Sequence, residues 1–209
     1  MSEDSQDGRG HGDHQPLVSQ PGPGAAGMAA DEPLPPHGTP AFERREGLAM
    51  IAALRILLAY LGIYRRLPSA DPDTSAEVIA GEIAALCPSD TVQVVNGFRR
   101  AETAFGDPAP GGFPPDGDRW REAARPVMLQ LCPPSHRDAA LVMMDHRIAA
   151  ETSPRTSDTV DAYVGASSRY PVAAIHAEAA LRSWMFTQSG LLRAGIQADL
   201  KITEFLLRG

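Results

Sequence analysis

Two short stretches of this 209-residue chain combine a histidine with a carboxylate, the groups that most often move protons in enzymes. One is Asp145-His146, and the other is His176 with Glu178 two residues later. Neighbouring residues of a helix point about 100° apart, so neither stretch makes an acid–base pair by itself. We expect any active site where the two helices that carry these stretches meet. The candidate catalytic residues are Asp145, His146, His176 and Glu178. Glu178 also precedes Arg182 by four residues, a spacing that predicts an ion pair on a helix surface.

The usual local motifs of catalysis are absent from the sequence. It contains no Gly-x-Ser-x-Gly, His-Glu-x-x-His, phosphate-binding loop or dinucleotide fingerprint. Its two cysteines, Cys87 and Cys132, exclude a four-cysteine zinc site and a disulfide-rich secreted scaffold. His11 and His14 lie in a glycine-rich stretch and make a poor metal site, so we predict no metal and no cofactor. One lysine, Lys201, accompanies 18 arginines, which is typical of a GC-rich, bacterial coding sequence.

Three arginines, Arg44, Arg55 and Arg66, are spaced by eleven residues, which corresponds to three helical turns. They follow one line of a helix in which residues 48–63 are apolar except for Arg55. This stripe is a candidate binding site for carboxylates of a protein partner. As an alternative, residues 48–63 cross a membrane, but the run is short and a central arginine costs a few kcal/mol or more. We therefore favour a buried helix of a bundle.

After residue 41 the chain reads as helices separated by short breakers, without the period-two alternation of strands. The expected helices cover residues 43–66, 75–86, 89–105, 119–131, 137–152, 157–166, 172–188 and 191–207. We predict an all-α fold, a single bundle of about seven or eight helices. Thr74 and Ser89 are the expected caps of the second and third helices, and Val92, Val95 and Phe98 are expected on the inner face of the third.

A short sequence repeat bears on the architecture of the bundle. Residues 85–89, Ala-Leu-Cys-Pro-Ser, recur as residues 130–135, Gln-Leu-Cys-Pro-Pro-Ser, and each copy joins two expected helices. A duplicated helical hairpin and a chance likeness are both compatible with only two copies.

The formal charge of -7 is concentrated at the start of the chain. Residues 1–41 carry six acidic side chains and one basic side chain, have no aromatic residue and are rich in glycine and proline, which predicts a disordered acidic tail. Residues 42–209 form the expected helical domain, which is nearly neutral at -2. Without a signal peptide the expected location is the cytoplasm, and the alternative is a secreted effector without a cleaved signal.

Residues 80–83 and 91–97 resemble the helix-turn-helix of periplasmic-sugar-binding-like repressors, whose second helix carries a Thr-Val-x-x-Val-Val-Asn-Gly run. The resemblance implies DNA binding through residues 91–97. The run is one residue shorter here, and Arg99-Arg100 is the only basic cluster nearby.

Asp71, Asp73 and Glu77 are similar to the acidic turn of small tellurite-resistance-B-like helical domains, which implies a cation site. The Asp-Gly turn of that family is missing from this chain.

The sequence favours a non-catalytic helical interaction, adaptor or regulatory protein that binds a protein partner. The alternative is an enzyme or small-ligand-binding protein whose site is assembled from scattered helical residues. Lower alternatives are membrane association through residues 48–63 and DNA binding through the helix-turn-helix. Strong nucleic-acid binding is not expected, because a concentrated basic face is missing from the sequence.

Overall fold

The computed structural model describes residues 31–64, 71–105, 116–152, 157–186 and 190–208, and these residues form helices without strands. The α-helices are α1 (Pro40–Tyr64), α2 (Pro72–Ala84), α3 (Thr91–Phe105), α4 (Gly117–Leu131), α5 (Arg137–Thr152), α6 (Ser157–Arg169), α7 (Pro171–Met185) and α8 (Gly190–Arg208). Two 3-10 turns, η2 (Pro88–Asp90) and η3 (Pro134–His136), precede α3 and α5. The predicted all-α bundle is confirmed, and the predicted helix ends lie within three residues of the observed ones.

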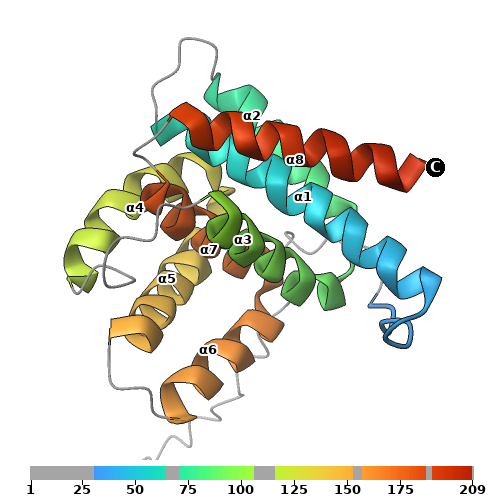
Figure 1. Ribbon diagram of the computed structural model, residues 1–209. Coiled ribbons are helices and arrows are strands. Elements are labelled where there is room, and N and C mark those ends of the chain that lie inside the picture. Colours follow the sequence, from blue (N-terminus) through green and yellow to red (C-terminus); the bar gives the residue numbers. More distant parts are fainter. Residues whose placement is uncertain (1–30, 65–70, 106–115, 153–156, 187–189, 209) are drawn as a thin grey trace, which may run out of the picture.

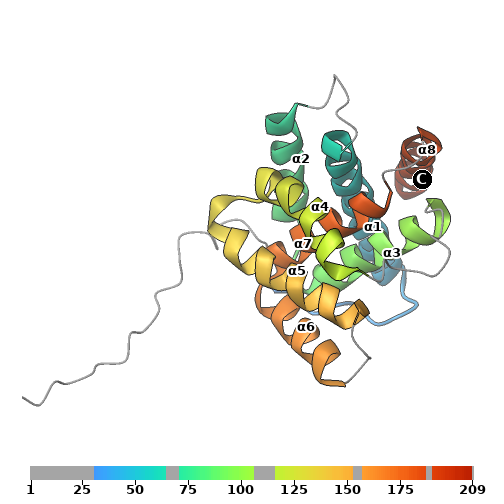
Figure 2. The ribbon, with the colours of Figure 1, turned by 90° about the vertical axis from the view of Figure 1, so that its left-hand side faces the viewer.

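Helix α7 occupies the middle of the bundle and packs against α1, α3, α4, α5 and α6 (Figures 1 and 2). Every residue from Ala173 to Ser183 is buried. Five of these eleven residues are alanine, and small side chains let neighbouring helices approach from all sides. A helix that is buried all round has no face left for solvated charges. The polar residues of α7 therefore need partners inside the protein.

Helix α1 is the second core element and packs against α2, α3, α7 and α8. Its buried side chains include Leu54, Ile56, Leu57, Tyr60 and Leu61, none of which is exposed. By length and composition α1 could cross a membrane, and so could α2 together with the η2–α3 segment, which meets it at 108°. Core helices of soluble proteins have the same length and composition. The contacts of α1 are those of a core helix. Helices α2 and α8 lie on its outer side, and α6 lies at the opposite end of the bundle (Figure 1).

Residues 1–30, the larger part of the predicted tail, lie outside the described residues. The part that follows is attached to the helices. Arg45 donates hydrogen bonds to the carbonyl oxygens of Glu32 and Pro33 at 3.1 and 3.2 Å, and Ser89 Oγ donates to the Glu32 carbonyl at 2.8 Å. Arg45 Nε also lies 2.6 Å from Asp90 Oδ1. This set of contacts joins the segment before α1 to the start of α3.

The predicted cap of α2 is wrong. Asp71 caps the helix instead, because its Oδ1 accepts the Asp73 N–H at 3.1 Å and Pro72 supplies the fixed φ that suits a first helical residue. Thr74 does not cap the backbone but donates its hydroxyl to Asp71 Oδ2 at 3.0 Å. The helix consequently begins three residues earlier than the sequence pattern predicted.

Ser89 likewise does not begin α3, because it lies within η2 and its Oγ bonds Arg45 and the Glu32 carbonyl. Val92 is 62% exposed, so its predicted place on the inner face is also wrong, whereas Val95 and Phe98 are buried as expected. The buried residues of α3 follow a three- and four-residue spacing from Thr91 through Val94 and Val95 to Phe98 and Ala101. Val92 comes one residue after Thr91, so it points about 100° away from Thr91 and lies off this face.

The repeated Cys-Pro sequence has the same local form in both copies. Each copy ends an α-helix and leads into a 3-10 turn, η2 after Cys87 and η3 after Cys132. The helix pairs differ, however: α4 and α5 pack against each other, whereas α2 meets η2 and α3 at 108° and both pack mainly on α1. Both cysteines are free thiols, and burial raises the pKa of Cys132 to about 12. Cys132 is therefore a poor nucleophile at neutral pH.

Two glycine substitutions, one at the α1–α3 contact and one on the open side of α2, should have opposite effects on stability. A Cβ on Gly97 would lie 2.7 Å from the Ala53 Cβ, while a Cβ on Gly81 of α2 would meet nothing within 4 Å. Gly97→Ala should lower the free energy of unfolding by about 1–3 kcal/mol through overpacking. Gly81→Ala should raise it by up to about 1 kcal/mol, because alanine favours the helix. Urea unfolding followed by circular dichroism measures both, and a stable Gly97→Ala variant would contradict the close packing.

Candidate functional site

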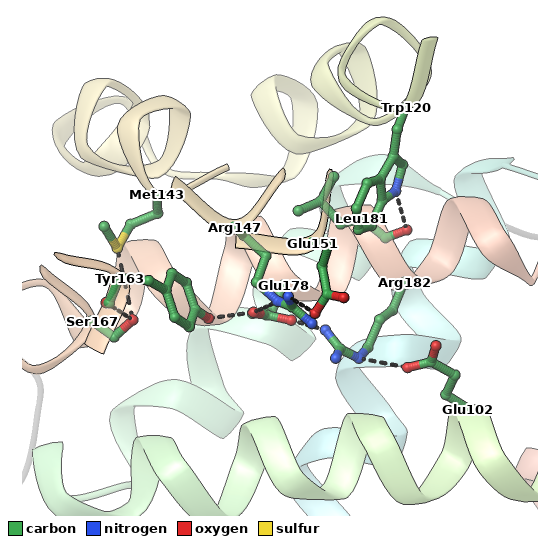
Figure 3. A network of polar contacts seen from close by, with 10 residues as sticks. All are labelled: Glu102, Trp120, Met143, Arg147, Glu151, Tyr163, Ser167, Glu178, Leu181 and Arg182. Atoms are coloured by element: carbon green, nitrogen blue, oxygen red, sulfur yellow. Dashed lines mark hydrogen bonds and ion pairs between the residues drawn. The ribbon is translucent and has the colours of Figure 1, made fainter. Parts of the chain in front are cut away.

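Among the described residues, a buried group of charged side chains surrounds Glu178 on α7 (Figure 3). Glu178 is 0% exposed, and Arg147 of α5 and Arg182 of α7 are 4% and 1% exposed. Arg147 Nε lies 2.6 Å from Glu178 Oε1, and Arg182 Nη1 pairs with Oε2. Tyr163 of α6 donates its hydroxyl to Oε1. One buried carboxylate is thus held by two guanidinium groups and a phenol from three helices.

Two further carboxylates complete the group at its edges. Glu151 of α5 pairs with Arg147, and Glu102 of α3 lies 3.1 Å from Arg182 Nε. Their side chains are 14% and 24% exposed, so the network reaches toward solvent through these two residues. Two guanidinium groups and three carboxylates come together, and they connect α3, α5 and α7 directly. We call these residues, together with Tyr163, the Glu178 network.

The electrostatics of the Glu178 network follow from its burial. Burial lowers the pKa of Arg182 to about 10, with the nearby Arg147 acting in the same direction. Arg182 therefore stays charged at neutral pH. Burial also raises the pKa of Tyr163, although Arg147 opposes this shift, so the phenol keeps the proton that it donates to Glu178. Buried ions need both opposite charge and hydrogen bonds to offset the loss of water, and this network supplies both.

Glu178 and Arg182 were expected as a surface ion pair, and this prediction is wrong. The two residues pair as the four-residue spacing indicates, but both lie in the core. The four-residue spacing describes only how the two side chains meet within one helix. Whether the pair is buried depends on α3, α5 and α6, which cover α7 on this side.

The four candidate catalytic residues lie on α5 and α7, and these helices pack together as expected. Their side chains nevertheless have separate partners. Asp145 is exposed and lies 2.5 Å from Arg121 of α4, while Glu178 lies inside its network. His146 is half-buried on α5, and His176 faces α1. The structure does not bring these four residues to a common site.

His176 belongs to a second buried polar contact. Its Nδ1 lies 2.7 Å from the hydroxyl of Tyr60, which joins α7 to α1. Burial lowers the pKa of His176 to about 3, with the nearby His136 acting in the same direction, and burial raises the pKa of Tyr60. Both groups are therefore neutral at pH 7. A neutral imidazole and phenol suit a structural hydrogen bond between core helices.

The arginine stripe is placed only in part. Arg44 is exposed on α1, and Arg66 lies outside the described residues. Arg55 Nη1 lies 2.7 Å from Glu82 of α2, and its Nη2 lies 2.6 Å from Glu204 of α8. The carboxylates that Arg55 binds in this structure thus belong to the chain itself. Arg55 holds two outer helices against α1.

Two shallow grooves on the described surface bear on the small-ligand alternative. One, of about 260 Å³, lies between α1, α2 and α8 beside Arg55 and Arg193. The other, of about 430 Å³, lies along α3 beside Asn96, Arg99 and Arg100. Neither groove contains a candidate catalytic residue, a histidine or a carboxylate.

The helix-turn-helix resemblance keeps one geometric feature. The 108° angle between α2 and the η2–α3 segment falls in the usual range for that motif. Asn96, Arg99 and Arg100 are exposed on α3, but Arg100 pairs with Glu46 at 2.7 Å. DNA binding stays a prediction from sequence.

The acidic cluster at the start of α2 is exposed, and Asp71 is engaged as the helix cap. Over the described ranges, no group of three or more His, Cys, Asp or Glu side chains is placed to hold a metal ion.

Sequence reasoning missed an apolar surface on α8. Ile202, Phe205 and Leu206 are 58%, 76% and 68% exposed. Their spacing of three and one residues puts them on one side of the helix. The spacing was visible in the sequence, but the same helix carries a second apolar side, and only the fold shows which side is covered.

Comparison of the chain with protein-family models, curated proteins and solved structures finds no match.

Removing the charge of Glu178 should unfold the protein readily. Glu178→Gln leaves Arg147 and Arg182 without their shared buried carboxylate, and breaking such a pair costs about 3–5 kcal/mol. The matched control is Asp145→Asn, which removes an exposed ion pair and should cost no more than about 1 kcal/mol. Thermal and urea unfolding measure both variants. Equal losses would show that the Glu178 network contributes no more than a surface contact.

Acid should destabilise the fold through His176. The unfolded chain takes up a proton on this imidazole below its ordinary pKa of 6.5, whereas burial delays this in the fold to a pKa of about 3. Between these two pKa values the unfolded state binds one more proton than the folded state. The free energy of unfolding therefore decreases as the pH is lowered, by up to about 1.4 kcal/mol per pH unit. The full contribution of neutral His176 is present above pH 6.5.

The variant His176→Asn keeps a hydrogen-bonding group for Tyr60 but does not titrate, so it should flatten the pH dependence of unfolding below pH 6.5. His146→Asn on α5 is the control and should retain the dependence of the unchanged protein. Urea unfolding at a series of pH values makes the comparison. An unaltered dependence in His176→Asn would refute the assignment to this residue.

Proposed function

We propose that this chain is a non-catalytic interaction module, an adaptor or regulatory protein that binds a protein partner through the outer side of α8. The observation that carries the proposal is the exposed apolar surface of Ile202, Phe205 and Leu206, which we call the α8 surface. The proposal places the protein in the cytoplasm, where its two free thiols are ordinary.

The α8 surface lies on a helix that already uses its other side. Ile196 is fully buried, and Leu200 and Leu207 are half-buried on the side that packs against α1. Single exposed apolar residues are common on proteins, but three large ones clustered on one helix indicate a contact surface. Phe205 supplies the aromatic anchor that often carries much of the binding energy at an interface.

The attachment of α8 makes this surface preformed. Near its end, Leu207 Cδ2 would lie 2.9 Å from a Cβ on Gly47, and near its start Phe105 would lie 2.6 Å from a Cβ on Gly195. Arg55 adds an ion pair to Glu204. A partner would therefore meet a helix that needs little ordering, which lowers the entropic cost of binding.

The placement of the candidate catalytic residues also supports a non-catalytic role. Glu178 and His176 are buried and contact internal partners, and Asp145 pairs with Arg121 on the surface. An enzyme of this kind needs at least two ionisable groups that converge on a space open to substrate. The grooves described above hold no such pair of groups.

A photo-crosslinking amino acid at position 205 tests the proposed function. Introduced into the full chain in cells of the source organism, it should yield a reproducible crosslinked product with a protein partner, because Phe205 is 76% exposed at the centre of the surface. The same amino acid at Val142 of α5, which is 53% exposed, is the matched control. Absence of a product, or the same products from position 142, would reject the α8 surface as a binding site.

A further inference from the structure

We infer that the partner of the α8 surface presents an amphipathic helix with acidic residues along one edge. This inference rests on the proposed function and names the chemistry of the partner. It follows from the charged residues that border Phe205, from the shape of the surface, and from the poor fit of a second copy or a membrane.

A basic edge borders the apolar residues. Lys201 lies four residues before Phe205 and Arg208 lies three residues after it, so both are its neighbours on the helix surface. Both are exposed, and Lys201 is the one lysine of the chain. Ile202 and Leu206 lie on the other side of Phe205. The surface therefore has an apolar strip and a positive edge.

The acidic residues of α8 do not neutralise this edge. Glu204 points to Arg55 of α1, and the two groups lie 2.6 Å apart. Asp199 is half-buried and lies two residues before Lys201, on a different side of the helix. Carboxylates of a partner would thus find the ammonium of Lys201 and the guanidinium of Arg208 beside the apolar strip. Complementary charge of this kind selects a partner and sets its orientation.

A helix suits the surface better than an extended peptide. Ile202, Phe205 and Leu206 repeat at the three- and four-residue spacing that lets one helix pack its ridges against another. Binding an added strand would require an open sheet edge, and the described part of the chain has no strand. An amphipathic helix buries its own apolar side at the same time, which supplies the driving force on both partners.

A second copy of the chain fits this surface less well where the two α8 helices pack antiparallel. When two α8 helices pack antiparallel about a twofold axis, the axis keeps corresponding edges on the same side of the pair. Lys201 and Arg208 of one copy would then face Lys201 and Arg208 of the other. Such like charges oppose association.

An anionic membrane is also a poorer fit. Only two basic residues, Lys201 and Arg208, border Phe205, whereas recruitment to an anionic surface takes a cluster of about four to eight. A single acidic helix meets the basic edge locally. The other charges of the protein beyond about 8–10 Å are largely screened at physiological salt.

Two designed peptides test the inference on the full chain. Both are amphipathic helices with leucine and phenylalanine along one side; one carries glutamate along its edge and the other carries lysine at the same positions. Fluorescence anisotropy should show that the glutamate peptide binds at least about tenfold more tightly, and that added salt reduces the difference. The double variant Lys201→Glu with Arg208→Glu should reverse the preference, and Phe205→Ser should weaken both peptides. Val142→Ser is the control and should change neither.

The remaining outcomes each reject the inference. Equal affinity for the two peptides, or binding of neither, would show that the surface does not select a helix with an acidic edge. A dimer in sedimentation that Phe205→Ser dissociates assigns the surface to a second copy. Cosedimentation with phosphatidylserine vesicles that Phe205→Ser abolishes assigns it to a membrane. The crosslinking experiment at position 205 is independent of charge, so a specific product there with no peptide preference would reject this inference and keep the proposed function.

Discussion

The bundle depends on the burial of α7 from Ala173 to Ser183, which leaves an ionised glutamate without access to water. A carboxylate in such a place is tolerated only when opposite charges and hydrogen-bond donors replace its hydration. Glu178 receives them from Arg147, Arg182 and Tyr163. These groups come from α5, α6 and α7, so the electrostatic requirement of one residue constrains the relative positions of three helices.

Two other contacts relate the remaining helices to this centre. The hydrogen bond between Tyr60 and His176 joins α1 to α7, with both groups neutral. Arg55 then joins α2 and α8 to α1 through two carboxylates. Polar contacts therefore accompany the apolar packing at each step outward. These polar contacts favour the observed arrangement of the helices, because any packing that separates buried polar groups from their partners is less stable.

The polar interior and the apolar surface lead to one view of the molecule. Glu178, His176 and Asp145 contact side chains of other helices. Three large exposed apolar side chains, by contrast, gather on α8: Ile202, Phe205 and Leu206. The surface proposed for binding is therefore preformed. The packing of α8 also explains why Phe205 can stay exposed. The opposite side of α8 packs on α1 and α3, so the helix cannot rotate to bury Phe205 without losing those contacts.

The sequence by itself determined the elements of this protein. The spacing of apolar residues and the breakers between them gave an all-α fold, and α5 was predicted with its observed bounds, because helix formation depends on residues three and four apart. Only the tertiary structure decided which sides of the helices meet. Glu178 and Arg182 have the spacing of a surface pair, and their burial comes from helices distant in sequence. Likewise α8 has apolar residues on two sides, and the close approach of Leu207 to Gly47 and of Phe105 to Gly195 selects the one that is covered. Such long-range contacts leave no periodic signal in the chain, since they depend on how separate helices fill space together.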